Sequence, residues 1–494
     1  AAPSCYNLTP PPLPPLSNTT RAPLRGGGGA LGPPPLPPPP RGACPAAKAP
    51  PDPPWNPPAP TPSRRTVLRG LGVSAVAAAP ILSSCSSGLK GSGSSTGDTI
   101  KIGYVSPRTG AYAAFAESDA YILEQVRAFF AKGITHDGKK YDVKILDRDT
   151  GSDPQQAATI ADELISQQQV DLVLVTATPD TIHPVAAKCE SEGVPCVSTI
   201  EPWQAWFFGR GGTPKKTFKY TFHFFDGIEH LSRVESDMWR QHHTNKKVGV
   251  LWPNDSDGNA FRDKTTGYRS QPSTKGFTFV DPGSYEPGTK DFSSIIQKFK
   301  SEGVEILAGV PSPPDFATFW TQAAQQNFKP KVATISKAIL FESTVASLPN
   351  NLGNGLCTAS WWVPQFPFTS TLTGQTATAL ADDYEKSSLA KGRTWNQGLG
   401  PNHALFEVAN HVLRNTNPKD REAVAAQIAK TSLDTVLGHL SWTGGGPANP
   451  VKNVATIPMV GTQWIKGSGN SYELKVVSNS LLPMVKPDAK AVEL

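Results

Sequence analysis

The sequence predicts an α/β protein of two similar lobes, each built around a parallel sheet with helices on both faces. Two observations lead to this prediction. Short apolar segments alternate with amphipathic helical segments in two series, one before residue 200 and one after residue 246, which is the order expected of parallel sheets. The segment Val170–Val175 (VDLVLV) is nearly all apolar, as a strand covered on both faces should be.

The first series begins with a strand and alternates regularly. One helix is expected because apolar residues recur on a single helical face from Ile122 to Phe130, before Gly133. A second is expected to begin at Asp153-Pro154, since proline at the first helical position loses no hydrogen bond. A third is expected at 180–190, and the strands at 100–105, 141–146, 170–175 and 194–198.

The second series repeats the layout of the first. Its strands are expected at 247–252, 277–281 and 304–310, and its helices at 257–268, 292–301 and 315–326. After residue 350 the chain becomes irregular and aromatic, then helical again at 403–415 and 420–429, and from residue 440 it has the character of short strands.

The N-terminal segment has a different composition from the rest. Residues 1–62 hold 23 of the 49 prolines and one acidic residue, Asp52. Such a segment buries too little apolar surface to offset its chain entropy, so we expect it to be a disordered leader. Residues 86–97 (SSGLKGSGSSTG) have the composition of a flexible Gly/Ser linker.

Residues 63–85 lie between these two segments and have the layout of an export signal. Arg64-Arg65 precede an apolar run, 70–82, that is too short to span a bilayer. The segment SRRTVL resembles the twin-arginine motif, with Val67 in place of the more usual phenylalanine. Leu82-Ser83-Ser84-Cys85 resembles the lipobox of bacterial lipoproteins. We therefore expect a twin-arginine lipoprotein signal, with Cys85 lipidated as the mature N-terminus; a fortuitous Arg-Arg pair before an Ala-rich segment is the alternative.

Composition excludes several classes of function. The formal net charge is +6, and no block of Lys and Arg follows the signal, so a nucleic-acid surface is not expected. Neither CxxC nor HxxxH spacing occurs, which excludes the usual metal sites. The sequence also lacks a GxGxxG after its first strand, a Walker motif and a GxSxG elbow. We therefore expect no cofactor, no metal and no catalytic residues.

One pair of cysteines is a candidate for a disulfide. Cys189 and Cys196 are seven positions apart, across an expected helix-to-strand turn. Outside the cytoplasm a disulfide between them is plausible, and a pair of small buried thiols is the alternative. We predict the disulfide.

Hydroxyl, proline and aromatic residues gather where the expected strands end. In an open α/β sheet, ligands bind beyond the carboxyl ends of the strands. Two lobes that present such ends to each other form a cleft that can close over a small polar molecule. The stretches concerned are SPRTGAY (106–112), TATPDT (176–181), STIEPWQAWF (198–207) and WPNDSD (252–257).

Two of the chain's longer stretches carry a family resemblance. IKIGYVSPRTGAY (100–112) and SYEPGTKDFSSIIQKFKSEGVEILAGVPSPPDFATFWTQAAQQNF (284–328) resemble the type I periplasmic solute-binding proteins of ABC transporters, in the branched-chain amino-acid (Leu/Ile/Val) binding family. The resemblance covers roughly residues 99–483. It implies an α/β fold of two Rossmann-like lobes with parallel sheets, joined by a three-segment hinge. The lobe boundaries are then expected at 98–225 and 336–440 for the first lobe, and at 226–335 and 441–494 for the second.

The resemblance also implies where a ligand would be held. The loop after the third strand of the family offers hydroxyls, here Thr176 and Thr178, and the next strand end offers Ser198 or Thr199. We nominate Asp255 or Glu201 as the acidic partner of a ligand ammonium. Pro311-Ser312-Pro313-Pro314 lacks an acid close to the strand end, a departure from the family that argues against an α-amino acid.

Aromatic residues near these loops complete the expected pocket. The candidates are Tyr112 and three tryptophans, Trp203, Trp252 and Trp361, whose alternative role is packing in the lobe core or between the lobes. If two of the tryptophans line the pocket, we expect a solute with a ring, an aliphatic body or a cation.

The expected function follows from the resemblance. It implies an extracytoplasmic protein, lipid-anchored to the outer face of the cytoplasmic membrane, that captures a small polar solute and delivers it to an ABC permease. The solute is expected to be an amino acid or a related amide or aromatic acid, and the protein a monomer. The alternatives are an extracellular sensor with the same fold, which would need a membrane-spanning or partner-coupling segment, and a secreted hydrolase.

Overall fold

The computed structural model of the protein describes residues 99–494. It confirms the predicted fold class, because it contains two seven-stranded sheets of mostly parallel strands with helices packed against them. The expected leader (1–62), the signal with Cys85 (63–85) and the linker (86–97) lie outside the described residues. In the described part of the chain, no helix is both long and apolar enough to cross a bilayer.

The first lobe is built on a sheet with the strand order β14-β6-β5-β4-β1-β3-β2. All neighbours are parallel except β2, which is antiparallel to β3. Every residue of β4 is buried, as its apolar sequence predicts. The strands are β1 (Thr99–Ser106), β2 (Ile134–His136), β3 (Lys139–Asp149), β4 (Leu172–Thr176), β5 (Cys196–Thr199), β6 (Thr221–Phe224) and β14 (Val454–Ala455).

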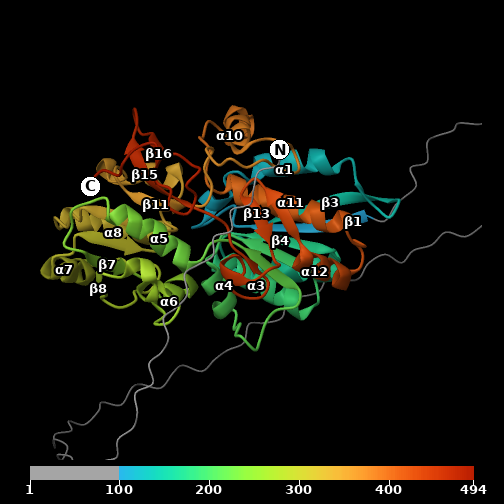
Figure 1. The fold of residues 1–494 in the computed structure, drawn as a ribbon, viewed down its shortest axis with the longest axis horizontal. Coiled ribbons are helices and arrows are strands. Elements are labelled where there is room, and N and C mark those ends of the chain that lie inside the picture. The colour runs from blue at the N-terminus through green and yellow to red at the C-terminus, as the bar shows by residue number, and fades with distance from the viewer. Residues whose placement is uncertain (1–98) are drawn as a thin grey trace, which may run out of the picture. The chain divides into compact units, whose positions relative to one another are not determined.

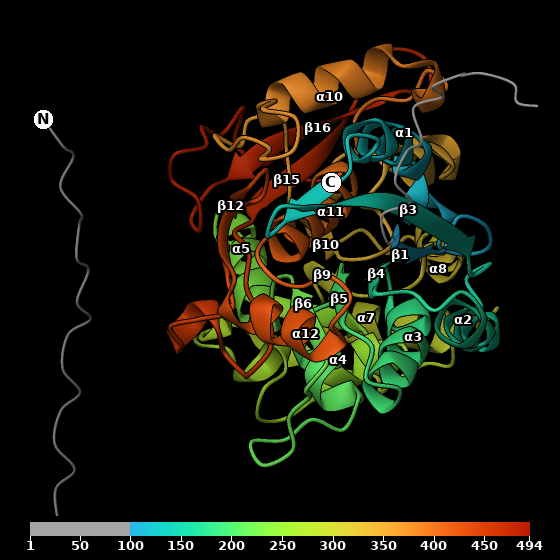
Figure 2. The ribbon, with the colours of Figure 1, turned by 90° about the vertical axis from the view of Figure 1, so that its right-hand side faces the viewer.

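Helices cover both faces of this sheet, which can be followed in Figure 2. Alternate residues of β4 point into different cores, Leu172 and Leu174 into one and Val173 and Val175 into the other. The first core is closed by α1 (Asp119–Phe130), α10 (Ala377–Lys386), α11 (Leu399–Arg414) and α12 (Arg421–Lys430), and the second by α2 (Pro154–Asp162), α3 (Pro179–Ser191) and α4 (Trp203–Gly209).

The second lobe, drawn mainly in yellow-green and gold in Figure 1, has the strand order β16-β15-β11-β10-β9-β7-β8. Its first five strands in the chain are parallel, whereas β15 is antiparallel to β11 and to β16. The strands are β7 (Lys247–Leu251), β8 (Thr278–Val280), β9 (Ile306–Gly309), β10 (Val332–Ile335), β11 (Cys357–Ser360), β15 (Val460–Lys466) and β16 (Tyr472–Ser478).

The helices of the second lobe also divide between two cores. One core contains residues of α7 (Ser293–Glu302), α8 (Pro313–Gln325) and α9 (Glu342–Ala346), and the other contains residues of α5 (Ile228–Trp239) and α6 (Ser256–Arg262). A separate hairpin, β12 (Ser432–Thr435) and β13 (Gly438–Ser441), precedes β14.

Helix starts follow the local sequence closely. Asp153 caps α2, its carboxylate accepting a hydrogen bond from the N–H of Gln156, and Pro154 occupies the first helical position as predicted. Four α-helices are not predicted by the sequence: α4, whose residues WQAWFFG are expected in a strand-end loop, α5, which follows the first crossover, and the later helices α9 and α10.

The chain passes between the two sheets three times, after β6, after β11 and after β14. Two of the predicted lobe boundaries need correction. The second crossover lies after Ser360 rather than at residue 336, because β11 pairs in parallel with β10. The third lies after Ala455 rather than at residue 441, because β14 pairs with β6 of the first sheet.

The predicted disulfide is wrong as well. In the described chain Cys189 at the end of α3 and Cys196 at the start of β5 are both buried free thiols. They lie in the same apolar core, and burial, together with a hydrogen bond to Cys196, raises the pKa of the Cys189 thiol well above its usual range. The helix-to-strand turn does bring the two side chains together, but as free thiols.

Candidate functional site

A small cavity lies between the strand ends of the two sheets. Its volume is about 40 Å³, enough for water but well below the 300–1,000 Å³ of common ligand pockets, so a solute would have to part the walls. Most of the lining is apolar, and the polar residues in it are Thr178, Glu201, Asp226, Asp257, Ser336 and Lys337. Because nearly all follow the carboxyl end of a strand, the cavity lies where an open α/β sheet binds its ligands.

The backbone is strained at four positions around this cavity. Ala177, Thr178, Ile200 and Lys337 all have positive φ, between +37° and +68°, although none is glycine. Such conformations cost of order 1–3 kcal/mol each and concentrate at functional sites. Each of the four residues lies one or two positions beyond the end of a strand.

The wall from the first lobe contains polar atoms that lack partners. Thr178, two residues beyond β4, is 2% exposed, yet its hydroxyl has no hydrogen-bond partner among residues 99–494. Glu201, two residues beyond β5, pairs through Oε1 with His183 Nε2 at 2.6 Å, but its Oε2 finds no partner in the described chain. Buried polar groups in proteins are almost always hydrogen-bonded, so these two side chains are candidates for contact with a molecule in the cavity.

Asp226 is the most incomplete member of this wall. It lies two residues beyond β6, is fully buried, and neither of its carboxylate oxygens has a partner in the part of the chain that the structure describes. Burial raises the pKa of this carboxyl well above its usual range, and the charges of Glu229 and Glu235 add to the effect. Burial thus favours the protonated form of Asp226 relative to a solvated aspartate.

The wall from the second lobe contains a counter-ion for its own carboxylates. Lys337, two residues beyond β10, places Nζ 2.7 Å from Asp257 Oδ2 and 3.3 Å from Asp255 Oδ2. Burial would lower the pKa of this lysine, but the two carboxylates raise it well above its usual range. Burial raises the pKa of Asp257 to about 7 despite Lys337. Asp255 also caps α6 by accepting the N–H of Gly258 at 2.8 Å.

The same lysine connects the two lobes. Lys337 Nζ lies 5.1 Å from the centre of the Tyr112 ring, which follows β1 in the first lobe. A cation at this distance from an aromatic face is attracted to it. The contact holds the walls of the cleft together at its edge.

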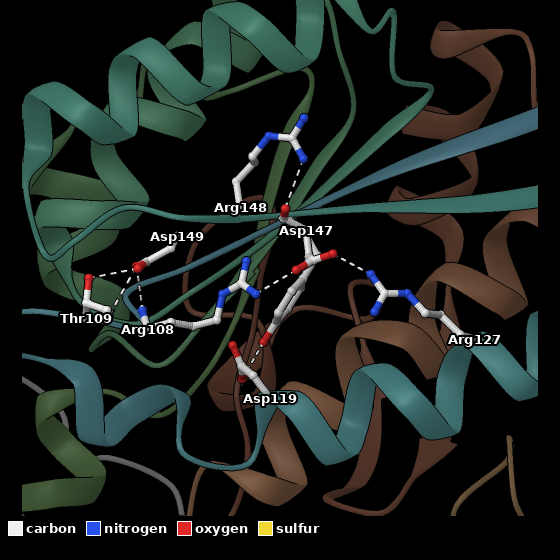
Figure 3. A network of polar contacts seen from close by, with 8 residues as sticks. Arg108, Thr109, Asp119, Arg127, Asp147, Arg148 and Asp149 are labelled. Carbon is white, nitrogen blue, oxygen red and sulfur yellow. Dashed lines mark hydrogen bonds and ion pairs between the residues drawn. The ribbon is translucent and has the colours of Figure 1, made fainter. Parts of the chain in front are cut away.

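A polar network at the end of β3 fixes the loop that carries Tyr112, and Figure 3 shows its main contacts. Asp149 accepts the N–H of Arg108 at 2.8 Å and the hydroxyl of Thr109 at 2.7 Å. Asp147 pairs with Arg108 at 2.6 Å and also with Arg127. Hydrogen bonds from this loop and from Gly151 hold the pKa of Asp149 below its usual range although burial opposes them. Asp147 and Asp149 therefore have structural roles.

Three of the predicted ligand-binding residues line the cavity, namely Thr178, Glu201 and Trp361. Two more, Tyr112 and Asp255, contact Lys337 at its edge. Whether these residues bind a ligand remains a prediction.

The other five predicted residues do not line the cavity, and their contact with a ligand likewise remains a prediction. The hydroxyls of Thr176, Ser198 and Thr199 bond sideways, to Asn402 (2.6 Å), His223 (2.9 Å) and the carbonyl of Phe224 (2.8 Å). These three hydroxyls belong to residues inside a strand and bond to neighbouring elements. Thr178 and Glu201, two residues beyond the ends of the same strands, line the cavity. Trp203 donates to Glu229 at 2.8 Å, and Trp252 packs on Phe261 in the core of the second lobe.

Sequence reasoning missed Asp226, Asp257 and Lys337. Asp226 and Lys337 occupy the same place, two residues after a strand end, as Thr178 and Glu201, but the strands that precede them, β6 and β10, are not among those that the sequence predicts. Within the described residues, no group of three or more His, Cys, Asp or Glu side chains is arranged to hold a metal ion.

Comparison with known proteins agrees with this geometry. Residues 99–466 match a family model described as periplasmic binding protein. A Leu/Ile/Val-binding protein homolog from Brucella melitensis is 26% identical over 213 residues, 42% of this chain and 53% of the relative. The match thus spans about half the length of that relative.

Solved structures show the same two-lobed fold at low identity. A leucine binding protein from Thermotoga maritima has a TM-score of 0.60 at 16% identity, covering 77% of this chain and 99% of that one. The branched-chain amino acid transporter substrate binding protein of Streptococcus pneumoniae, in complex with isoleucine, has a TM-score of 0.57 at 18% identity. The match covers 77% of this chain and 100% of that one. A solute binding protein from Rhodopseudomonas palustris, in complex with 3,4-dihydroxybenzoic acid, has a TM-score of 0.57 at 16% identity. The match covers 80% of this chain and 98% of that one.

Proposed function

This chain belongs to the periplasmic binding protein family, and we propose that it is an extracytoplasmic solute-binding protein that delivers a small polar solute to an ABC permease. The observation that carries the proposal is the cavity between the lobes. Buried polar atoms of Thr178, Glu201 and Asp226 point to a bound molecule there, because the described chain offers them no partner.

The relatives indicate the size and class of the solute. Among the similar structures, one was solved with isoleucine and another with 3,4-dihydroxybenzoic acid. Both molecules pair an apolar or aromatic body with polar groups, as does a cavity with apolar walls and a few polar side chains. We propose an amino acid or a related amide or aromatic acid, and no catalytic role for the protein.

A calorimetric screen of such solutes tests this function. A ligand present at a hundredfold excess over its Kd stabilises the fold by about 2.7 kcal/mol, so a true solute should also raise the melting temperature. Failure of every amino acid, amide and aromatic acid to bind would count against a solute-binding role. Loss of transport in cells after deletion of the gene, restored by the intact chain, would support delivery to a permease.

We also propose that the protein is exported by the twin-arginine route and anchored through Cys85. These positions lie outside the described residues, and the proposal rests on the Arg64-Arg65 pair and the lipobox-like Leu82–Cys85. Cys85→Ala should leave the protein unprocessed or release it from membranes. Recovery of mature protein that still carries residues 1–62 would contradict the proposal.

A further inference from the structure

A second groove lies between the two lobes, separate from the cavity described above, although Leu340 lines both. Its volume is about 350 Å³, within the range of common small-molecule sites. The first lobe contributes α10 and residues 394–397 to its walls, and the second lobe contributes β16 and the start of α9. Figures 1 and 2 show α10 next to β16, the edge strand of the second sheet.

The charged side chains that line this groove are mainly acidic. Lys475 is the single cation among them, and it pairs with Glu473 at 2.5 Å. A concave surface with an excess of one charge concentrates ligands of the opposite charge. Four further acids line the groove and form no ion pair within the described chain: Glu342, Asp382, Glu385 and Asp488.

Hydrogen bonds hold the walls of the groove in place. Glu342 accepts the hydroxyl of Thr394 at 3.1 Å, across the lobes, and the N–H of Tyr472 at 3.0 Å. Glu385 accepts the N–H of Trp395 at 2.9 Å. Because these groups are fixed before a ligand arrives, less free energy is lost in ordering them on binding.

An aromatic side chain adds a flat surface to the acidic one. Trp395 lines the groove and packs edge-on against Trp362, with ring centres 6.0 Å apart. An aromatic ring attracts cations and buries the apolar parts of a ligand. The groove therefore suits a cation with an organic body.

One buried amide in the wall lacks an acceptor. Asn396 lines the groove and is 5% exposed, yet its Nδ2 has no hydrogen-bond partner among residues 99–494. Its Oδ1 accepts the N–H of Gly398 at 3.0 Å, which fixes the orientation of the amide and leaves Nδ2 as the free donor. Buried donors almost always have an acceptor, so this one points to an oxygen on a ligand.

We infer that this groove binds a hydroxylated organic cation of the amino-sugar or amino-alcohol class, with its ammonium among the carboxylates and a hydroxyl oxygen at Asn396 Nδ2. A simple polyamine would leave Asn396 without an acceptor. Among residues 99–494, no group of three or more His, Cys, Asp or Glu side chains is arranged to hold a metal ion. The site is separate from that of the proposed function, and because both lobes supply its walls, an occupant would hold them together on this side.

A matched series of compounds tests the inference by calorimetry at low salt. Glucosamine is compared with glucose, which lacks the ammonium, and with cyclohexylamine, which lacks the hydroxyls. Ethanolamine is compared with ethylene glycol and ethylamine in the same way, and calcium chloride tests a metal. We expect at least one hydroxylated amine to bind with a Kd below about 1 mM, and its two counterparts to bind at least about tenfold more weakly. Binding should weaken as the salt concentration rises, because salt screens exposed carboxylates.

Three variants locate the binding site. Asp382→Asn in the first lobe and Asp488→Asn in the second should each weaken binding by about fivefold, the effect of losing one exposed ion pair. Asp383→Asn is the matched control, because Asp383 neighbours Asp382 on α10 but accepts from Gln375 and does not line the groove. It should leave the affinity within about twofold.

Several results would overturn the inference. Binding of neither hydroxylated amine, or equal binding of its uncharged counterpart, would exclude a cation site. Equal binding of the amine without hydroxyls would remove the role of Asn396, and tighter binding of calcium would exclude an organic ligand. Affinity unchanged in both Asp382→Asn and Asp488→Asn, or weakened equally in Asp383→Asn, would show that the compounds bind elsewhere or only through general attraction. None of these results bears on the cavity of the proposed function.

Discussion

The two walls of the cleft differ in how their buried polar and charged groups are paired. In the second lobe, Lys337 lies between Asp255 and Asp257 and is the counter-ion of both carboxylates. In the first lobe, Thr178, Glu201 and Asp226 keep polar atoms for which the described chain has no partner. The first wall therefore leaves four buried polar atoms without a partner, whereas among the cavity-lining residues of the second wall only Asp257 Oδ1 lacks one in the described chain.

The largest effect is expected from removing the cation of the second wall. Lys337→Met would leave Asp257, whose side chain is 4% exposed, buried without its counter-ion, at a cost of about 3–5 kcal/mol in the free energy of unfolding. Denaturant titration measures this cost. The double variant Lys337→Met/Asp257→Asn should recover part of the loss, and a single variant as stable as the wild type would show that the second wall does not depend on this pair.

The first wall should respond in affinity rather than in stability. Thr178→Val is expected to weaken solute binding by roughly ten- to a hundredfold, because a solute group would lose its hydroxyl partner, while the melting temperature stays nearly constant. Thr176→Val is the matched control two residues earlier. Its hydroxyl bonds to Asn402, so it should cost stability without changing affinity, and the reverse result for the pair would place the pocket elsewhere.

Buried acids should make the second lobe less stable as the pH rises. Burial raises the pKa of Glu235 from 4.5 in the unfolded chain to about 7 in the fold. The folded protein therefore binds the proton more tightly than the unfolded one, and stability falls as pH rises from about 4.5 to about 7. Denaturant titrations at pH 5 and pH 8 should differ less in Glu235→Gln than in the wild type, by on the order of 1–3 kcal/mol. An unchanged difference would contradict this assignment.

The smallest effect is expected outside the cleft. Arg127 pairs with Asp147 at the surface of the first lobe, with its side chain 48% exposed. Arg127→Ala should cost at most about 1 kcal/mol in stability and leave solute affinity unchanged. A larger loss would mean that the network in Figure 3 contributes more to the cleft than its exposure suggests.

The fold could be predicted from the sequence because its central strands carry strong local patterns, as the run of β4 shows. The lobe boundaries could not, because β11 and β14 are short and are defined by pairing with strands distant in the chain. No feature in the sequence of Val454–Ala455 indicates that this strand pairs with β6.

The site could be predicted in part for the same reason. Thr178 and Glu201 follow the ends of strands that the sequence predicts, whereas Trp361 follows β11, which it does not predict. Asp226 and Lys337 occupy equivalent places, but a carboxyl and an amine at a lobe boundary are indistinguishable in sequence from solvated surface residues. Their burial depends on how the two lobes meet. The side-chain direction of Thr176, Ser198 and Thr199 likewise depends on neighbours that only the folded sheet supplies.

A crystal structure of the protein with a solute identified by calorimetry would decide whether the first wall is a binding surface. We predict the solute between the two lobes, within hydrogen-bond distance of the Thr178 hydroxyl and of an Asp226 oxygen, with Trp361 beside it. A solute bound instead in the separate groove lined by Glu342, Trp395 and Glu473, with Thr178 and Asp226 still unpartnered, would contradict this prediction.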